Sequence, residues 1–192
     1  MSYCVYLTHP EVAIDPEVPV PDWGLSDIGR ERAEKATSLS WASDICRVIS
    51  SRERKAVETA EIFASPLGLT PIAIAAMHEN DRSATGFLPP DEFEHVADAF
   101  FADPDASIRG WERARDAQHR IVEAVRDALK HIPDAEPVLL AGHGGVGTLL
   151  KCHLLGVPIS RVHDQAGGGH WYRFAKTDIE TCSATGLDWV RL

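Results

Sequence analysis

The residues best placed to do chemistry are two histidines, each of which follows a short apolar run. His143 lies in a glycine cluster between an apolar run at 138–141 and an apolar segment at 146–154, and His9 follows an apolar run at 3–7. Glycines let a backbone turn sharply and approach a ligand closely, and the first turn of a helix offers free N–H groups. The stretch 138–150 therefore predicts an anion site, with His143 where the ligand would lie.

Two further polar turns follow predicted strands. The strand predicted at 45–49 leads into Ser50-Ser51-Arg52-Glu53-Arg54-Lys55, which holds three cations within four residues. A solvated charge cluster is the commoner outcome for such a run. Glu79 likewise follows a weakly alternating strand predicted at 70–77. Taken singly, His9 and His143 would each be interpreted as hydrogen-bonded structural histidines, so a functional interpretation depends on the whole set.

The elements that must position these residues are predicted from hydrophobic periodicity. Ser26 is expected to cap a helix that ends near Leu39, with Ile28, Ala33 and Ala36 on its apolar face. The other predicted elements are a helix at 56–63, a short helix at 93–101 that could cover a pocket, the longest amphipathic helix at 111–131, and closing strands at 171–174 and 187–190. The aromatic residues of the short helix are as consistent with core packing as with a pocket wall.

Gly142, Gly144 and Gly147 also fit the G-x-G-x-x-G pattern of dinucleotide-binding turns. We reject that interpretation because the segment 156–164 is too broken by glycine and proline to be the second strand that a nucleotide half-domain needs. A plain strand-to-helix turn would explain the glycines but would leave His143 unexplained.

Composition limits the partners and the compartment. The 192 residues, 44% of them hydrophobic, predict a single domain, 1–192. A formal charge of −10 argues against a nucleic-acid or anionic-membrane partner, because those partners need a basic face. Four cysteines lack C-x-x-C spacing, and the first apolar run is too short for a signal or a membrane span. We therefore expect a cytoplasmic protein with reduced thiols. The sequence leaves the oligomeric state open.

Five pieces of sequence, in order, resemble the histidine phosphatase superfamily, also called phosphoglycerate mutase-like. They are His9 at a strand end; Leu25-Ser26 with Gly29 and Ala33; Ser50-Ser51 with Lys55-Ala56 and Glu58-Thr59-Ala60; Glu79; and Gly142-His143-Gly144. The match spans most of the chain. The resemblance implies a three-layer α/β/α sandwich around a mixed, mostly parallel sheet. It also implies a site at the strand ends, where ligands bind in such folds, and a small cap segment at about 82–111.

Roles for three residues are carried over from this resemblance. It implies that His9 is the nucleophile that takes the phosphoryl group, with no metal or other cofactor required. It implies that His143 binds the phosphate oxygens and that Glu79 protonates the leaving oxygen and then activates water. Substrate-binding contacts are expected from Thr8, Ser51, Arg52, Lys55, Arg82 and Gly144.

The chain departs from the family pattern beside the nucleophile. Thr8-His9-Pro10 replaces the family's Arg-His-Gly, so one neutral donor stands where a forked, charged donor is expected. Pro10 also removes an N–H group, and the family's second arginine falls on Lys55. One lost donor in such a site costs roughly 100 to 1,000-fold in rate. Arg52 and Arg82 are the candidates to supply the missing guanidinium.

The sequence favours a metal-independent phosphomonoesterase that acts on a small phosphorylated metabolite through phospho-His9. The alternative is a catalytically weak or inactive relative that binds a phosphorylated or anionic ligand, or inorganic phosphate, as a binding or regulatory protein. A mutase is disfavoured because an acidic chain offers few spare cations for a second phosphate. A metal site built from His9, His143 and Glu79 is disfavoured because no close H-x-x-x-H type spacing supports it.

Overall fold

The computed structural model describes residues 3–192 and is built around one six-stranded sheet in the order β3-β2-β4-β1-β5-β6. Strands β1 to β4 run parallel to their neighbours, whereas β5 is antiparallel to β1 and β6 is antiparallel to β5. The predicted mixed, mostly parallel sheet is therefore confirmed. The strands are β1 (Tyr3–Thr8), β2 (Arg47–Ser51), β3 (Ile72–Ile74), β4 (Val138–Gly142), β5 (His170–Ala175) and β6 (Val190–Arg191).

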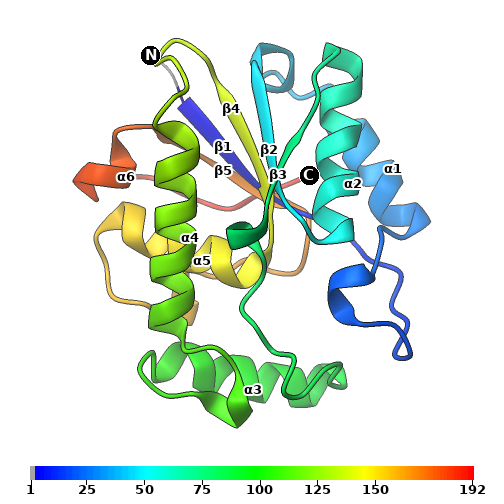
Figure 1. Ribbon diagram of the computed structural model, residues 1–192, viewed down its shortest axis with the longest axis vertical. Helices are drawn as coiled ribbons and strands as arrows, with labels where there is room; N and C mark the ends of the chain where they lie inside the picture. The colour runs from blue at the N-terminus through cyan, green and yellow to red at the C-terminus, as the bar shows by residue number, and fades with distance from the viewer. Residues whose placement is uncertain (1–2) are drawn as a thin grey trace.

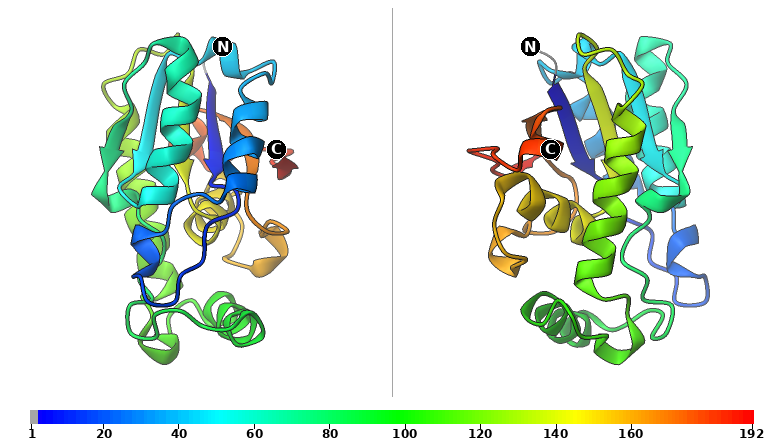
Figure 2. Two further views of the ribbon diagram at one scale, coloured as in Figure 1. Left: turned by 90° about the vertical axis from the view of Figure 1, so that its right-hand side faces the viewer. Right: turned by 60° about the vertical axis from the view of Figure 1, so that its left-hand side comes forward.

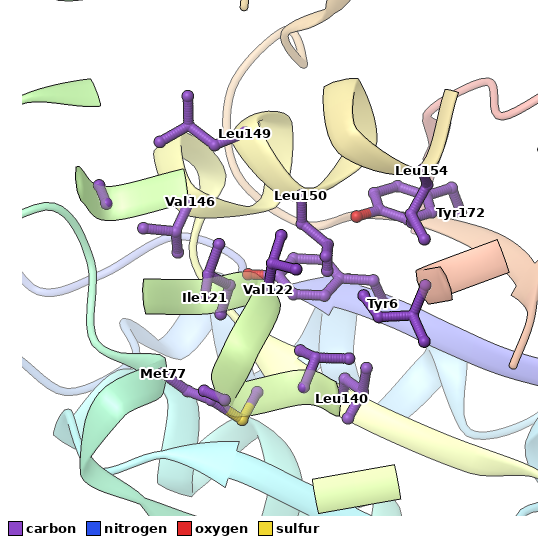
Figure 3. Close-up of a cluster of buried hydrophobic side chains, with 14 of the residues drawn as sticks. Tyr6, Met77, Ile121, Val122, Leu140, Val146, Leu149, Leu150, Leu154 and Tyr172 are labelled. Carbon is purple, nitrogen blue, oxygen red and sulfur yellow. The ribbon is translucent and has the colours of Figure 1, made fainter. Parts of the chain in front are cut away.

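Helices cover both faces of the sheet (Figures 1 and 2). Successive side chains of a strand point to opposite faces, and in β1 both sets are apolar. Val5 and Leu7 pack in the cluster that includes α1 and α2, while Cys4 and Tyr6 pack in the cluster that includes α4 and α5 (Figure 3). The helices are α1 (Asp27–Ala36), α2 (Arg54–Ala64), α3 (Pro90–Ala102), α4 (Ala114–Leu129), α5 (Gly144–Leu155) and α6 (Asp178–Thr181).

The first helix begins where the sequence predicts but presents a different face. Ser26 Oγ accepts a hydrogen bond from the Gly29 N–H at 3.1 Å, which satisfies one free donor of the first turn. Ile28, predicted on the apolar face, is 65% exposed. Gly29 lies against the Glu11 backbone instead, since a Cβ there would stand 2.1 Å from the Glu11 carbonyl oxygen. Close backbone packing therefore sets the rotation of α1, and the prediction for Ile28 is wrong.

Element ends differ from prediction where strands lie at an edge of the sheet. The strand predicted at 70–77 is shortened to β3, because a single 3-10 turn at Ala75–Met77 follows it. The closing strand predicted at 187–190 appears only as the two-residue β6. Both strands lie at an edge of the sheet and have one neighbour each, so fewer hydrogen bonds between strands extend them.

Helix α3 lies beyond the carboxyl ends of the parallel strands, apart from the two main helical layers (Figure 1). It begins with Pro90, whose missing N–H would have no partner in a first turn anyway. Its buried residues are Val96, Ala97, Phe100 and Phe101, in agreement with the predicted helical spacing. Among residues 3–192, no helix is long and apolar enough to cross a membrane.

Candidate active site

His9 stands directly after β1, and its backbone N–H continues the sheet by donating to the Gly142 carbonyl at 3.0 Å. Its ring Nδ1 lies 2.9 Å from the Pro10 carbonyl oxygen. Because a carbonyl oxygen only accepts, Nδ1 carries the proton and Nε2 keeps its lone pair. Burial lowers the pKa of His9 to about 4, so the ring is neutral at pH 7. His9 also lines a cavity of about 280 Å³.

His143 occupies the turn between β4 and α5, with its ring close to that of His9. The two ring centroids are 5.3 Å apart. The Tyr6 hydroxyl fixes the His143 backbone, accepting from its N–H at 3.2 Å and donating to its carbonyl at 3.1 Å. Burial lowers the pKa of His143 to about 4, although the nearby Glu53 and Glu79 carboxylates oppose this. Within residues 3–192, neither ring nitrogen has a hydrogen-bond partner, but the ring is completely buried and lines neither the His9 cavity nor the larger cavity beside it.

The N-terminus of α5 holds an anion, and that anion is the carboxylate of Glu79. Its two oxygens accept hydrogen bonds from the Gly145 N–H at 3.1 Å and the Val146 N–H at 2.9 Å. These are donors that a helix start leaves free, and the helix dipole favours a negative charge there. The sequence located this anion-binding geometry correctly but did not anticipate that a side chain 66 residues away fills it.

The glycine cluster around His143 makes room for side chains. The residues that would clash with an added Cβ are the Tyr6 ring at Gly142 and Gly147, Gln165 Nε2 at Gly144, and Glu79 Oε1 at Gly145, all at 2.4 to 2.8 Å. None of these four glycines adopts a positive φ. Their lack of a side chain, rather than an unusual backbone conformation, is what the site requires.

Lys55 is buried and neutralised by a carboxylate two residues away. Its ammonium pairs with Glu53 and donates to the Val20 carbonyl at 2.9 Å. The side chains of Lys55 and Glu53 are only 3% and 10% exposed. Burial opposes ionisation of Glu53, but His143 and Lys55 outweigh it and lower its pKa to about 2. Glu53 Oε1 lies 3.7 Å from His143 Nε2, so an ionised carboxylate borders the predicted phosphate site.

The hydroxyl groups of Thr8 and Ser51 are engaged within the protein. Thr8 Oγ1 accepts from the His170 N–H at 2.9 Å and donates to Gln165 Oε1 at 2.7 Å. Ser51 Oγ accepts from the Glu53 N–H at 3.1 Å and so shapes the turn before α2. Neither residue lines the cavity at His9. These two hydroxyl groups form hydrogen bonds within the protein and do not line the cavity.

The two candidate arginines lie in different surroundings. Arg82 lines the His9 cavity and also an adjoining cavity of about 450 Å³ that reaches Val20 and Glu53. Its guanidinium stacks 4.9 Å from the Phe93 ring centroid, and among the ion pairs of residues 3–192 it has none. Arg52 is exposed and lines neither cavity. Gly144 lines the His9 cavity as well.

Sequence reasoning missed several residues of the cavities. Asn80 lines both cavities, and its side-chain Nδ2 is buried without a partner in the part of the chain that the structure describes. Glu53, Arg161, Asp164 and Gln165 were missed too. Only Glu53 carried a signal, as the one acidic residue inside a cationic turn. The cap aromatics Phe93, Phe100, Phe101 and Trp111 prove to be both core residues and cavity wall.

The described chain offers no ready metal centre or disulfide. Between residues 3 and 192, no group of three or more His, Cys, Asp or Glu side chains is arranged to hold a metal ion. The four cysteines, at positions 4, 46, 152 and 182, are free thiols.

The sequence model of the histidine phosphatase superfamily (branch 1) matches residues 16–178. The chain belongs to this family. The matched span includes Glu79 and His143 and begins after His9. No curated protein sequence shows significant similarity to the chain.

Solved structures of the histidine phosphatase superfamily share this fold over nearly the whole chain. A mycobacterial glucosyl-3-phosphoglycerate phosphatase complexed with inorganic phosphate is 22% identical, with a TM-score of 0.75 over 90% of this chain and 89% of that one. Bacillus stearothermophilus YhfR is 21% identical, with a TM-score of 0.73 over 100% and 95%. Phosphoserine phosphatase from Entamoeba histolytica, complexed with 3-phosphoglyceric acid, is 16% identical, with a TM-score of 0.71 over 91% and 90%. These likenesses establish a phosphoglycerate mutase-like α/β fold.

Proposed function

We propose that this protein is a phosphomonoesterase that works through a phosphohistidine at His9. The observation that carries the proposal is the hydrogen bond from His9 Nδ1 to the Pro10 carbonyl, 2.9 Å long. It leaves the Nε2 lone pair of a neutral ring beside a cavity that Glu79 also lines. Nucleophile and acid–base group therefore reach the same space.

The reaction proceeds in two steps. Glu79, a carboxylate in the resting site, first takes up a proton from solvent. His9 Nε2 then attacks phosphorus, the bond from phosphorus to the ester oxygen breaks, and Glu79 protonates the departing alkoxide. Glu79, now a carboxylate, takes a proton from water, whose oxygen attacks phosphorus and releases phosphate and neutral His9. His143 binds the non-bridging oxygens, and Arg82 is the cation nearest to them. No step requires a metal ion.

The dimensions of the site favour a small phosphorylated metabolite. A cavity of about 280 Å³ lies at the lower end of the range for small-molecule sites. Phe93, Phe100 and Trp111 give it an apolar wall. Arg82 places a cation on its lining, whereas Arg161 is already paired with Glu94 and Asp98. The structural relatives that are a glucosyl-3-phosphoglycerate phosphatase and a phosphoserine phosphatase support this class of substrate.

A second candidate function is supported by the Glu53–Lys55 pair. Phosphoryl transfer depends on neutralising three oxygens, and here Lys55 is neutralised by Glu53 while Thr8 donates within the protein. A relative with these features would bind phosphate or another anionic ligand and turn over slowly or not at all.

Hydrolysis of an aryl phosphate between about pH 5 and 8, in EDTA, separates the two candidates. Wild type is compared with His9→Ala and with His119→Ala, whose histidine is exposed and lines neither cavity. Turnover that survives EDTA, disappears in His9→Ala and persists in His119→Ala supports the phosphohistidine route, as does acid-labile phosphate on His9. Full turnover in His9→Ala would contradict it. No turnover with phosphate still bound would favour the second candidate.

A further inference from the structure

Gln165 lines the candidate site, and its side-chain amide has no role in the mechanism described above. It lies in the loop between α5 and β5 and lines the His9 cavity together with Gly144. Its side-chain Nε2 approaches the start of α5 so closely that a Cβ on Gly144 would stand 2.6 Å away. An amide donor therefore sits beside the helix end that follows His143.

Thr8 fixes the direction of this amide. The Thr8 hydroxyl accepts from the His170 N–H at 2.9 Å, and its own proton has two acceptors within reach, Gln165 Oε1 at 2.7 Å and the His170 carbonyl at 3.2 Å. The shorter contact favours Gln165. With Oε1 held from the side of β1, the Nε2 group points away from Thr8 and toward Gly144. Thr8 is completely buried, which leaves its hydroxyl no competing water.

The loop that carries Gln165 is fastened on two sides. Its backbone N–H donates to Asp164 Oδ1 at 2.8 Å, and the same oxygen accepts from Thr148 on α5 at 2.7 Å. Arg161 donates to the Glu94 carbonyl on α3 at 3.1 Å and pairs with Asp98 there. A donor on a braced loop loses less conformational entropy on binding than one on a mobile loop.

We propose that Gln165 is a binding residue for the phosphoryl group, and that Thr8 is the residue that positions it. The Thr8–Gln165 pair would thereby replace, with a neutral donor, the charged donor that the family has at position 8. This rests on the proposed function only in taking the His9 cavity as the phosphoryl site. A neutral donor stabilises a dianion less than a guanidinium does, so the replacement lowers affinity without abolishing it.

Binding of inorganic phosphate and of orthovanadate to the full chain, measured by isothermal titration calorimetry, tests the proposal without any need for turnover. Gln165→Ala is expected to weaken phosphate binding about tenfold or more, the loss typical of one hydrogen bond to a charged group. Gln165→Glu should weaken it further through repulsion. Gln118→Ala is the matched control, because Gln118 is the other glutamine of the chain and lines neither cavity; its phosphate affinity should equal that of wild type.

Thr8 is tested by a pair of variants. Thr8→Val keeps the shape but removes the hydroxyl, so it should weaken phosphate binding as Gln165→Ala does, and the double variant should be no worse than either single one. Thr8→Ser restores the hydroxyl and should restore binding. A merely structural role for Thr8 would give additive losses in the double variant, because Thr8 and Gln165 would then contribute independently.

The outcomes separate this proposal from the phosphatase itself. Phosphate affinity in Gln165→Ala equal to that of wild type overturns the role of Gln165, even if His9 is phosphorylated. Weakened binding in Gln165→Ala with no phosphate ever found on His9 supports the role of Gln165 and counts against the phosphatase. Wild type that binds neither phosphate nor vanadate overturns both.

Discussion

The ends of β1 and β2 border the candidate site, and within residues 3–192 neither end places an unpaired cation on the lining of the His9 cavity. At the end of β1, Thr8 offers only a neutral hydroxyl, which donates to Gln165. After β2, a cation is kept as Lys55, but Glu53 pairs with it inside the protein. The β1 end therefore offers a neutral hydroxyl donor, whereas at the β2 end the positive charge of Lys55 is neutralised by Glu53.

This difference shows that the reacting groups and their electrostatic setting can vary separately. The rings of His9 and His143 lie 5.3 Å apart, and Glu79 lines the same cavity as His9. The charges around them are close to balanced, because Glu53 offsets Lys55 and Glu79 lies on the α5 N-terminus. The four predictions below test each end of the sheet, from the largest expected effect to the smallest.

Removing Lys55 should show how much the Glu53–Lys55 ion pair contributes to the stability of the fold. Lys55→Met leaves Glu53 as a buried carboxylate without its partner, which is expected to lower the free energy of unfolding by about 3 to 5 kcal/mol. Urea denaturation measures the loss. The double variant Glu53→Gln with Lys55→Met should recover most of it, and a single-variant loss below about 1 kcal/mol would show that the pair contributes little.

Acid should destabilise the two ends in different pH windows. His9 and His143 have a pKa of about 4 in the fold and 6.5 when unfolded, so the unfolded chain binds more protons and stability falls as pH drops from 6.5 to 4. His143 alone contributes roughly 3 kcal/mol to this fall. Glu53, with a folded pKa of about 2 and an ordinary value of 4.5, contributes stability that is lost between pH 4.5 and 2.

Denaturation curves at a series of pH values check these windows. His143→Gln should flatten the slope between pH 6.5 and 4 and also shrink the loss below pH 4.5, because His143 helps to lower the pKa of Glu53. Glu53→Gln should remove the lower window and lower the pKa of His143 further, because the Glu53 carboxylate no longer favours the charged ring. A slope above pH 4.5 that is unchanged in His143→Gln would contradict the assignment.

Cancelling Glu53 should convert the β2 end into a charged anion site. Glu53→Gln frees the Lys55 ammonium and removes a carboxylate 3.7 Å from His143, so phosphate affinity should rise. Removing one negative charge at this distance should raise the phosphate affinity about tenfold or more. Calorimetry at pH 7.5 measures the affinity, and raising the salt concentration should shrink the gain. Unchanged or weaker binding would mean that Glu53 does not oppose the ligand.

The two arginines distinguish a relocated cation from neutral donors alone. Arg82→Ala should weaken phosphate binding about fivefold to tenfold, because Arg82 lines the cavity and has no ion-pair partner among residues 3–192. Arg52→Ala should leave it unchanged, because Arg52 is exposed outside both cavities. If wild type and both variants bind phosphate with equal affinity, neither arginine binds the phosphoryl group, and only neutral donors contact it.

Periodicity was enough to predict most helices and strands, because apolar runs and helical spacing record which faces are buried, whereas the three-layer architecture was implied by the family resemblance. It failed where a contact between distant segments decides the outcome. Ile28 is exposed because Gly29 packs on the Glu11 backbone, and β3 is short because it has one neighbour. Neither cause is visible in the local sequence.

The candidate site shows the same division. The strand ends and the anion-binding geometry after β4 followed from glycines and apolar runs, which are local signals. The occupant of the α5 N-terminus, Glu79, and the partner of Thr8, Gln165, come from 66 and 157 residues away. A single glutamine in a loop without a pattern gives no sign of the cavity that it will line.

The place of β1 in the sheet has a consequence for how the chain is made. Its neighbours are β4 and β5, which begin at Val138 and His170, so β1 leaves the ribosome long before either strand exists. Val5 and Leu7, fully buried in the finished protein, stay uncovered on the nascent chain during that time. Pairing over such separations is slow and leaves apolar edges open to aggregation. β1 can therefore pair with its neighbours in the sheet only after β4 and β5 have been synthesised.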